Sequence, residues 1–364
     1  MKRAAIGLGL MLCLALPRHA LAQSSTVTIY GLIDEGVTHV DNVGGSRLNK
    51  LDDSVSQGNR LGFRGREDLG DGLAAVFTLE QGFSTDTGAL RQGGIAWGRA
   101  AFVGLTHSAY GQLTLGRQYD QMTGALIRFH PGFHGGIYGF TPGDADRVAG
   151  AWLNNQITYA SPAIGGFRFN AQVSAAEDGS STTNAGRAES ASVTYANGPL
   201  NVGAAVTQIR GYTVRPSASY GVSRFLGASV GPATTILLPK YRTLGIGAGY
   251  AFAATTLSAL YTRSTFENSA GRSEAMTTLG ASVAYKLSEP LLLAAGVQRA
   301  KLEGAARTTF NAVADYYLSK RTDIYLSVNS QKASAAGTVA VLLTNGPSSN
   351  DTQTALRTGI RHRF

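Results

Sequence analysis

The feature that most constrains the fold of this chain is a repeated alternation of apolar and polar residues. In the segment 167–173, Phe, Phe, Ala and Val alternate with Arg, Asn and Gln. The segments 27–34 and 324–329 follow the same period of two. Because successive side chains of a strand point to opposite faces, this pattern is typical of strands with one apolar face and one polar face. We therefore expect an all-β fold. The exported part of the chain has no apolar stripe with the 3.6-residue period of a helix that is longer than two turns.

The N-terminus has the three parts of a secretory signal peptide. A basic start precedes an apolar run from Ala4 to Leu16, and the triplet 20–22 has the small residues at which signal peptidase cuts. The apolar run is too short to span a bilayer, and the large residue before Cys13 argues against a lipoprotein. We expect residues 1–22 to be a signal peptide and residues 23–364 to form a single exported domain.

The composition of the exported part excludes several classes of protein. Cys13 is the only cysteine, so a disulfide framework, a thiol nucleophile and a cysteine-ligated metal are excluded. After cleavage 29 basic and 23 acidic residues remain, a net charge of +6. No apolar stretch approaches the roughly 20 residues of a spanning helix. A closed β-barrel can still cross a membrane, because its backbone groups pair between strands and its lumen face is polar.

The connectors between the expected strands alternate in length. Such an alternation is typical of outer-membrane barrels, which have short turns on the periplasmic side and long loops outside. Sixteen strands would give about 21 residues per strand and connector, which fits strands of roughly 10 residues, and 14 or 18 strands stay open. We expect short turns near 68–72, 161–162, 197–199, 253–254, 288–290 and 319–321, and longer segments near 41–58, 84–97, 121–153, 176–188, 211–240, 266–275, 303–307 and 333–352.

Aromatic residues gather near the expected short turns. Tyrosine rings favour the boundary between membrane and water, where the ring is buried and the hydroxyl stays hydrated. A girdle of this kind explains the clustering better than the core of a soluble β-protein does. Its expected members are Tyr159, Phe167, Tyr195, Tyr250, Phe252, Tyr285, Tyr316 and Tyr317.

Six segments, in order along the chain, carry a resemblance to a known family. They are residues 25–34 (STVTIYGLID), 60–70 (RLGFRGREDLG), 101–105 (AFVGL), 113–118 (LTLGRQ), 154–162 (NNQITYASP) and 359–364 (GIRHRF). With these segments behind a signal peptide, the chain resembles the general porins of Gram-negative bacteria, the trimeric 16-stranded type known from Burkholderia, Bordetella and Neisseria.

The resemblance implies a 16-stranded antiparallel transmembrane β-barrel in the bacterial outer membrane, with a third loop folded inward. The third loop would be residues 121–153, the longest connector. The expected function is passive diffusion of small hydrophilic solutes and ions, without a cofactor. The expected partners are two further copies in a homotrimer, outer-membrane lipid, and the barrel-assembly machinery, for which Phe364 would be the recognition signal.

The selectivity of such a pore depends on the charges at its narrowest point. The resemblance places Arg60 and Arg99 among the arginines that face the constriction in anion-preferring relatives. The alternation supports Arg60 independently, because its apolar neighbours take the lipid face and direct Arg60 and Arg64 into the lumen. Arg99 and Arg117 share a face with apolar residues, so they need a bulge or a position beyond the apolar band.

The third loop should supply the opposing charges. Asp144 and Asp146 are its only carboxylates, and we expect both at the constriction. Trp152 occupies the stretch where the family has a third arginine, and Arg147 could reach in from the loop instead. Because charge-lined clefts carry potentials of a few kT, the net charge of +6 predicts a weak preference for anions.

Two other functions stay open, a substrate-selective channel with a lumenal binding site and an adhesin or enzyme on a barrel scaffold. No histidine pairs recognisably with a nucleophile, so the sequence predicts no catalysis. His130 and His134 have no obvious third ligand, which argues against a metal site. The glycines at 245–249 precede no helix and fit a strand rather than a phosphate-binding loop. The dispersed basic residues argue against nucleic-acid binding.

Overall fold

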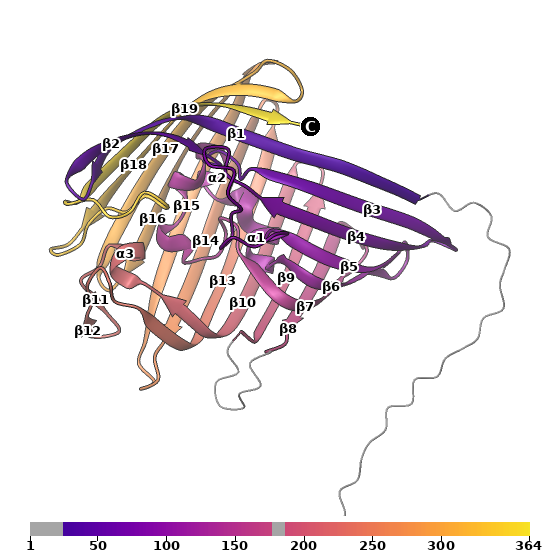
Figure 1. The fold of residues 1–364 in the computed structure, drawn as a ribbon, viewed down its shortest axis with the longest axis horizontal. Coiled ribbons are helices and arrows are strands. Elements are labelled where there is room, and N and C mark those ends of the chain that lie inside the picture. The colour runs from indigo at the N-terminus through magenta and orange to yellow at the C-terminus, as the bar shows by residue number, and fades with distance from the viewer. Residues whose placement is uncertain (1–24, 177–185) are drawn as a thin grey trace, which may run out of the picture.

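The computed structural model describes residues 25–176 and 186–364, so the expected signal peptide lies outside the described residues. The described chain forms one antiparallel sheet that closes on itself. Closure comes from β1 (Ser25–Val43), which pairs with β19 (Thr352–Arg363). In Figure 1 the strands lie side by side around a lumen that holds short helices.

The sheet has seventeen strand segments, two of which share one position in the barrel. β2 (Ser46–Asp53) pairs with the second half of β1, and β3 (Arg60–Gly70) pairs with the first half. Residues 54–59 leave the sheet between them. The barrel therefore has sixteen strands, as predicted.

The remaining elements follow in chain order. The other barrel strands are β4 (Leu73–Gly82), β5 (Ala100–His107), β6 (Gly111–Tyr119), β7 (Trp152–Ala160), β8 (Phe167–Ser174), β9 (Ala188–Asn197), β10 (Leu200–Val214), β13 (Ile236–Phe252), β14 (Thr255–Glu267), β15 (Ser273–Ser288), β16 (Leu291–Leu302), β17 (Ala305–Tyr317) and β18 (Thr322–Ser334). The connector between β6 and β7 contains α1 (Gln121–Leu126), α2 (Gly132–Gly135) and the 3-10 helices Ile127–Phe129, Ile137–Gly139 and Pro142–Asp144. The connector between β10 and β13 contains α3 (Pro216–Tyr220), β11 (Arg224–Phe225) and β12 (Ala228–Ser229).

Among the described connectors, short turns occupy one rim of the barrel and longer connectors occupy the other, with two exceptions to the expected lengths. Most of the connector expected near 176–188 lies outside the described residues. The connectors expected near 41–58 and 303–307 are tight turns at 44–45 and 303–304. Both residues of each turn have positive φ, for example 51° at Glu303 and 76° at Gly304. Glycine tolerates this conformation, and such turns match the twist of adjoining antiparallel strands.

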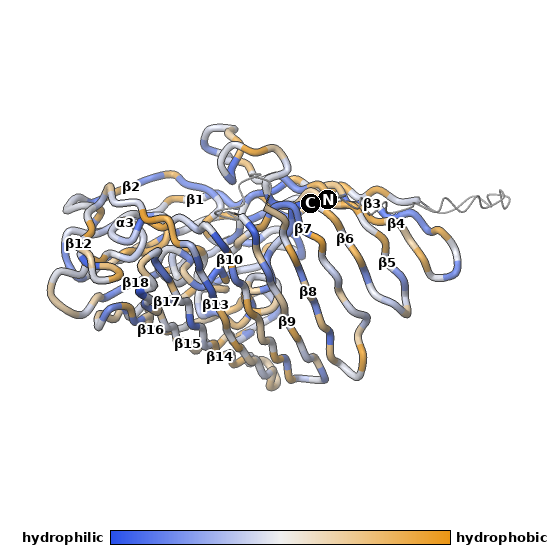
Figure 2. Tube along the Cα trace, turned by 90° about the horizontal axis from the view of Figure 1, so that it is seen from below, coloured by the Kyte–Doolittle hydropathy of each residue, from blue (hydrophilic) through white to orange (hydrophobic). Residues whose placement is uncertain are grey.

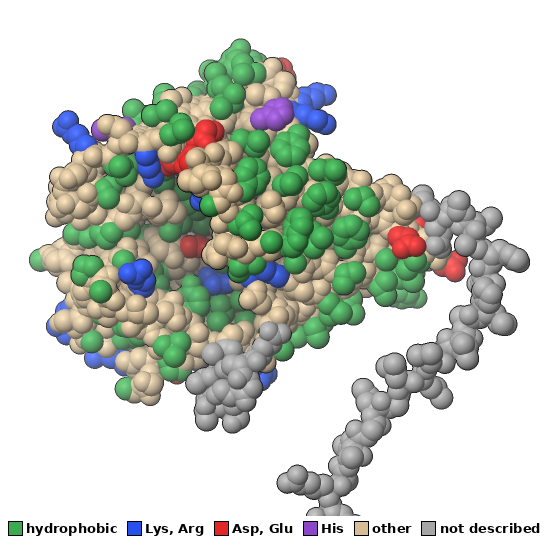
Figure 3. Space-filling view, in the orientation of Figure 1, with side chains coloured by type: hydrophobic (Ala, Val, Ile, Leu, Met, Phe, Trp, Pro, Cys, Tyr) green, Lys and Arg blue, Asp and Glu red, His purple; other side chains and the backbone are tan. Residues whose placement is uncertain are grey.

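The apolar residues of the alternation lie on the outer face of the barrel. Val103, Leu279 and Phe310 are 58%, 65% and 49% exposed, and their sequence neighbours face the lumen. Figure 2 shows the resulting change of hydropathy along each strand, and Figure 3 shows hydrophobic side chains gathered where β3 to β6 run in Figure 1. Tyr159 and Phe252 of the expected girdle are exposed on this face beside short turns. Among the described residues, no helix has the length and apolar character needed to cross a bilayer.

The buried apolar side chains lie inside the barrel, where connectors pack against strands. One cluster joins Met122, Leu126 and Phe129 of the β6–β7 connector to Ala205 and Leu260 of the barrel wall. A second cluster packs Tyr220 and Phe225, from the β10–β13 connector, against Tyr241 and Phe266. The inward-folded third loop is therefore part of the core of the molecule.

Candidate pore constriction

The third loop is fixed at its base by a buried ion pair. Asp120 caps α1 by accepting a hydrogen bond from the Thr123 amide at 3.1 Å, and its other carboxylate oxygen binds the Arg147 guanidinium. Asp120 and Arg147 are both buried, so each charge depends on the other for its stability. The Thr123 hydroxyl then donates to the Arg147 carbonyl at 2.7 Å. These contacts join the two ends of the loop.

Asp146 ties the C-terminal part of the loop to the barrel wall. Its carboxylate accepts hydrogen bonds from the Thr141 hydroxyl at 2.7 Å and from the Thr262 hydroxyl of β14 at 3.2 Å. Asp146 is 1% exposed. His130 lies close by, with Nε2 at 3.2 Å from the Thr141 hydroxyl oxygen, and burial lowers the pKa of His130 to about 3. This group of contacts holds the loop against the wall while His130 stays neutral.

Glycines on the lumen face of the barrel make room for the loop. A Cβ atom on Gly247 would lie 2.5 Å from the Phe129 ring, and one on Gly245 would lie 2.7 Å from Leu126. A Cβ on Gly280 would lie 2.6 Å from Pro131. Side chains at these positions would push the loop toward the centre of the pore. The glycines at 245–249 belong to β13, as the alternation predicted.

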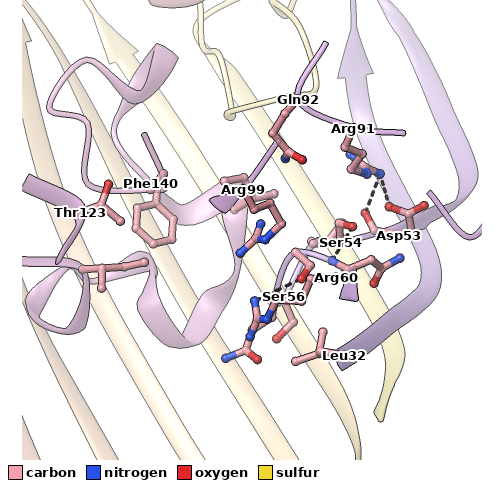
Figure 4. A pocket seen from close by; sticks show the side chains of 18 of the residues that line it. Leu32, Asp53, Ser54, Ser56, Arg60, Arg91, Gln92, Arg99, Thr123 and Phe140 are labelled. Carbon is pink, nitrogen blue, oxygen red and sulfur yellow. Dashed lines mark hydrogen bonds and ion pairs between the residues drawn. The ribbon is translucent and has the colours of Figure 1, made fainter. Parts of the chain in front are cut away.

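A cavity of about 1010 Å³ lies between the third loop, β3 and the connectors of β2 and β4. In Figure 4, Arg60, Arg91 and Arg99 come from the barrel side, while Phe140 and Thr123 belong to the loop across from them. The cavity is rich in charge. Its basic residues are Lys50, Arg60, Arg64, Arg91, Arg99 and Arg363, and its acidic residues are Asp52, Asp53, Glu80 and Asp144.

The three carboxylates of the barrel wall are neutralised by nearby cations. Glu80 accepts from Arg99 Nε at 2.7 Å. Asp52 lies 3.0 Å from Lys50 Nζ, and Asp53 binds Arg91, as the dashed lines in Figure 4 show. An ion pair presents almost no net charge to a passing solute. The wall therefore acts on ions mainly through the cations that lack such a partner.

Arg60 and Arg64 are those cations. Among the described residues, no carboxylate lies within 4.0 Å of either guanidinium. Arg60 donates to the Gly58 carbonyl at 3.2 Å, and Arg64 lies over the Tyr30 ring at 5.0 Å. A Cβ on Gly58 would approach Arg99 Nη1 to 2.8 Å, so the absence of a side chain there lets Arg60 and Arg99 come together.

Four of the predicted site residues line this cavity: Arg60, Arg64, Arg99 and Asp144. Arg60 and Arg64 lie on the lumen face of β3, as the alternation predicted. Arg99 does not share the outward face of the apolar residues of β5, because it precedes that strand, which begins at Ala100. Burial, and then the nearby Asp146 carboxylate, raise the pKa of Asp144.

The other three predicted residues do not line the cavity. Arg117 continues the face of Leu113 and Leu115, because its pairing with Ala101 of β5 follows theirs without a shift, and its side chain donates to the Gly98 carbonyl at 2.7 Å and to Asn154. Asp146 and Arg147 are buried in the loop by the contacts described above. Their sequence position placed them in the right loop, but hydrogen bonds to the wall and to Asp120 turn them away from the solute path.

Several charged residues of the cavity were not predicted from the sequence. Glu80 could have been found, because it continues the lumen face of β4 with Thr78. Asp52 and Asp53 fall in a segment that the connector pattern assigned to a long loop. Arg91 reaches the cavity from the connector between β4 and β5, and no periodic signal marks it.

Among the described residues, one group of carboxylates has the spacing to hold a metal ion. Its members are Glu35, Asp53 and Asp86. The Asp53 carboxylate already binds Arg91 and accepts from the Thr85 amide at 2.7 Å. These contacts use the oxygens that a cation would need.

Comparisons with known proteins agree with this architecture. A model of the Gram-negative porin family matches residues 9–336. The chain is 31% identical to outer membrane porin protein 32 of Delftia acidovorans over 100% of both proteins. It is 32% identical to an outer membrane porin protein of Bordetella pertussis over 67% of this chain and 66% of that protein.

Among solved structures, the fold is similar to that of an anion-selective porin from Comamonas acidovorans, with a TM-score of 0.78. The two share 24% sequence identity over 94% of this chain and 100% of that chain. The closed barrel, the inward loop and the charged lumen thus occur together with a family match over most of the sequence. The chain belongs to the Gram-negative porin family of the bacterial outer membrane.

Proposed function

We propose that this porin is a general diffusion channel with a weak preference for anions, and that Arg60, Arg64 and Arg99 form the basic wall of its constriction. The observation that carries the proposal is the charge balance of the cavity. Six cations face four carboxylates, and the three wall carboxylates are already paired. A small hydrophilic anion entering the cavity therefore meets Arg60 and Arg64 without competition from the wall.

Asp144 supplies the opposing charge from the loop. It lines the same cavity, and its carboxylate accepts a hydrogen bond from the Ala149 amide at 2.8 Å. A basic wall facing an acidic loop produces a field across the pore that orients polar solutes. Arg117, Asp146 and Arg147 support the loop and the rim in this proposal. The Comamonas porin, with a similar fold, is described as anion-selective.

Planar-bilayer recording on the purified porin tests the proposal. The double variant R60Q/R64Q removes the two unpaired cations. A unit charge about 7 Å from an ion changes its energy by about 0.6 kcal/mol in water, which is roughly threefold in a permeability ratio for each charge. We expect the ratio of chloride to potassium permeability, obtained from the reversal potential in a KCl gradient, to fall several-fold.

The variant R66Q is the matched control. Arg66 follows Arg64 on the same face of β3, and it does not line the cavity. An equal fall of the permeability ratio in R66Q would contradict the assignment of the constriction. Current that rises linearly with salt supports general diffusion, whereas saturation would favour a substrate-selective channel. A preference for cations in the unmodified porin would overturn the anion preference itself.

The assembly of the porin is proposed from the family resemblance. We infer a homotrimer, whose contact surface is the apolar outer face over β3 to β6 (Figure 3). Conductance steps in groups of three would support it, and single steps would contradict it. We also infer that Phe364, whose ring lies 42% exposed beside Gly31, is recognised during barrel assembly. Normal outer-membrane levels of F364A would contradict that role.

No catalytic role is part of the proposal. The cavity is lined by Ser54 and Ser56, but its lining contains no histidine or cysteine among the residues that the structure describes.

A further inference from the structure

Among the described residues, the basic side chains on the outer face of the barrel near the rim with the long connectors include five on β13, β14, β16 and β18. They are Arg242 on β13, Arg263 on β14, Arg299 and Lys301 on β16, and Lys332 on β18. All five are exposed, and each lies on the same face of its strand as apolar residues nearer the other rim. Charged side chains on the lipid face cost least near the membrane boundary, which is the level that this position indicates.

The strand register arranges four of these cations in two rows. Arg263 is opposite Thr277 on β15, and Thr277 is opposite Lys301. Arg299 is opposite Thr308 on β17, and Thr308 is opposite Lys332. Because neighbouring strands are about 4.8 Å apart, the two cations of each row are separated by roughly 10 Å, with a hydroxyl between them.

The two rows meet at β16, where the surface is hollowed. A groove of about 390 Å³ is lined by Arg299 and Lys301, with Ala275, Thr277 and Ala306 among the small residues beside them. Arg299 and Lys301 are two residues apart on one strand, about 7 Å along it. The groove thus offers two cations and a hydroxyl around a space that a small anionic group can enter.

The cations of the two rows have no internal counter-ions. Among residues 25–176 and 186–364, no carboxylate lies within ion-pair distance of Arg263, Arg299, Lys301 or Lys332. In the lumen, by contrast, several buried cations are paired, for example Arg99 with Glu80. Glu303 is the one carboxylate of the groove lining. Burial and the neighbouring Glu274 raise the pKa of Glu303 to about 7, so its negative charge is incomplete near neutral pH.

We propose that the two rows bind phosphate groups on the headgroups of lipids in the outer leaflet, with one phosphate in the groove between Arg299 and Lys301. The long connectors mark this rim as the external side, so the groove faces the headgroup layer of the outer leaflet. Guanidinium and ammonium groups form strong, charge-assisted hydrogen bonds with phosphate oxygens. Threonine hydroxyls between the cations add donors to the same oxygens.

Binding of fluorescent diphosphoryl lipid A to the purified, detergent-solubilised porin tests the inference. The variant R299Q/K301Q should bind this lipid at least tenfold more weakly than the unmodified porin. The matched control K320Q/R321Q removes the same charge from the short turn at 318–321, on the opposite rim, and should bind normally. Unchanged single-channel conductance in both variants shows that the barrels are folded and separates this test from that of ion selectivity.

Three outcomes would overturn the inference. Equal weakening in both variants would mean that the total charge of the barrel attracts the lipid. Equal affinity of the unmodified porin for lipid A stripped of its phosphates would remove phosphate as the recognised group. Complete displacement of the lipid by millimolar inorganic phosphate would assign the groove to a free anion instead of a lipid headgroup.

Discussion

At the scale of single residues, Asp144 differs from the other carboxylates of the cavity. Among the described residues, no cation lies within 4.0 Å of it, whereas Asp52, Asp53 and Glu80 are each paired. Burial and the nearby Asp146 raise the pKa of Asp144 above the value of an ordinary aspartate, about 3.9. A carboxyl group with a raised pKa takes up a proton at a higher pH than an ordinary aspartate does.

The anion preference of the pore is therefore expected to increase on acidification. Because burial and the nearby Asp146 raise the pKa of Asp144, uptake of a proton by Asp144 on acidification removes one negative charge from the cavity. We expect the chloride-to-potassium permeability ratio to rise about threefold, as for any single charge at this distance. Reversal potentials at several pH values measure this ratio. The variant D144N should show the higher ratio already at pH 7, and a D144N response identical to that of the unmodified porin would contradict the role.

The direction of a side chain could be predicted from the sequence only where the strand is regular. Arg60 and Arg64 lie on the strand face that the alternation indicates, because β3 pairs with β4 without a shift from Arg60 to Asp68. Arg117 does not line the cavity because it keeps the face of Leu113 and Leu115, and the irregularity beside it lies in β7, where Gln156 to Leu153 spans one residue more than Gly116 to Gln118. The contact that holds Arg147 away from the cavity could not be predicted, because its partner, Asp120, is 27 residues away in the chain and no local pattern connects them.

At the scale of elements, the third loop and β13 fit each other through missing side chains. Phe129 occupies the space above Gly247 and Gly249, and Leu126 occupies the space above Gly245. The alternation predicted that β13 is a strand, but it gave no reason for a lumen face without side chains. The reason is the loop, whose contact with β13 could not be predicted from either segment alone.

A side chain at position 247 should displace the loop into the pore. The variant G247V places a Cβ atom 2.5 Å from the Phe129 ring, so the ring must move toward the lumen. We expect a lower single-channel conductance and a noisier open state in bilayer recordings. The control A248V adds two carbons, where G247V adds three, and it adds them on the outer face, where Ala248 is exposed. It should leave the conductance unchanged. A normal conductance in G247V would show that the loop does not limit the current.

At the scale of the whole molecule, a buried polar network joins the first and last strands. Arg357 of β19 donates to the Tyr325 hydroxyl at 2.7 Å and to the Thr38 hydroxyl at 3.1 Å, and it lies 3.4 Å from Asp34 of β1. Asp34 also accepts from the amide of Ser56 at 2.6 Å. Arg357 and Asp34 are both almost fully buried. The network closes the barrel and holds the segment 54–59 at the cavity.

Loss of Arg357 should weaken the closed barrel. The variant R357Q leaves Asp34 as a buried charge without its cation, which costs about 3–5 kcal/mol. We expect the unfolding temperature, measured by the shift of the heated protein on SDS gels, to fall clearly. The control R363Q removes a partly exposed arginine from the same strand, and Asp323 keeps Arg361 as its partner, so a loss of about 1 kcal/mol or less is expected. Similar unfolding temperatures for the two variants would contradict the importance of the network.

The glycines of β13 also disfavour an incorrect strand register during folding. A slip of one residue would turn Leu244 and Ile246 toward the lumen and the glycines toward the lipid. The branched side chains would then collide with Phe129, so the loop could not dock on a misaligned strand. A barrel with this error would lack the contacts between the loop and β13. Its strands could therefore still separate and pair again in the correct register. The loop that narrows the pore thus also acts as a template against which strand alignment is checked.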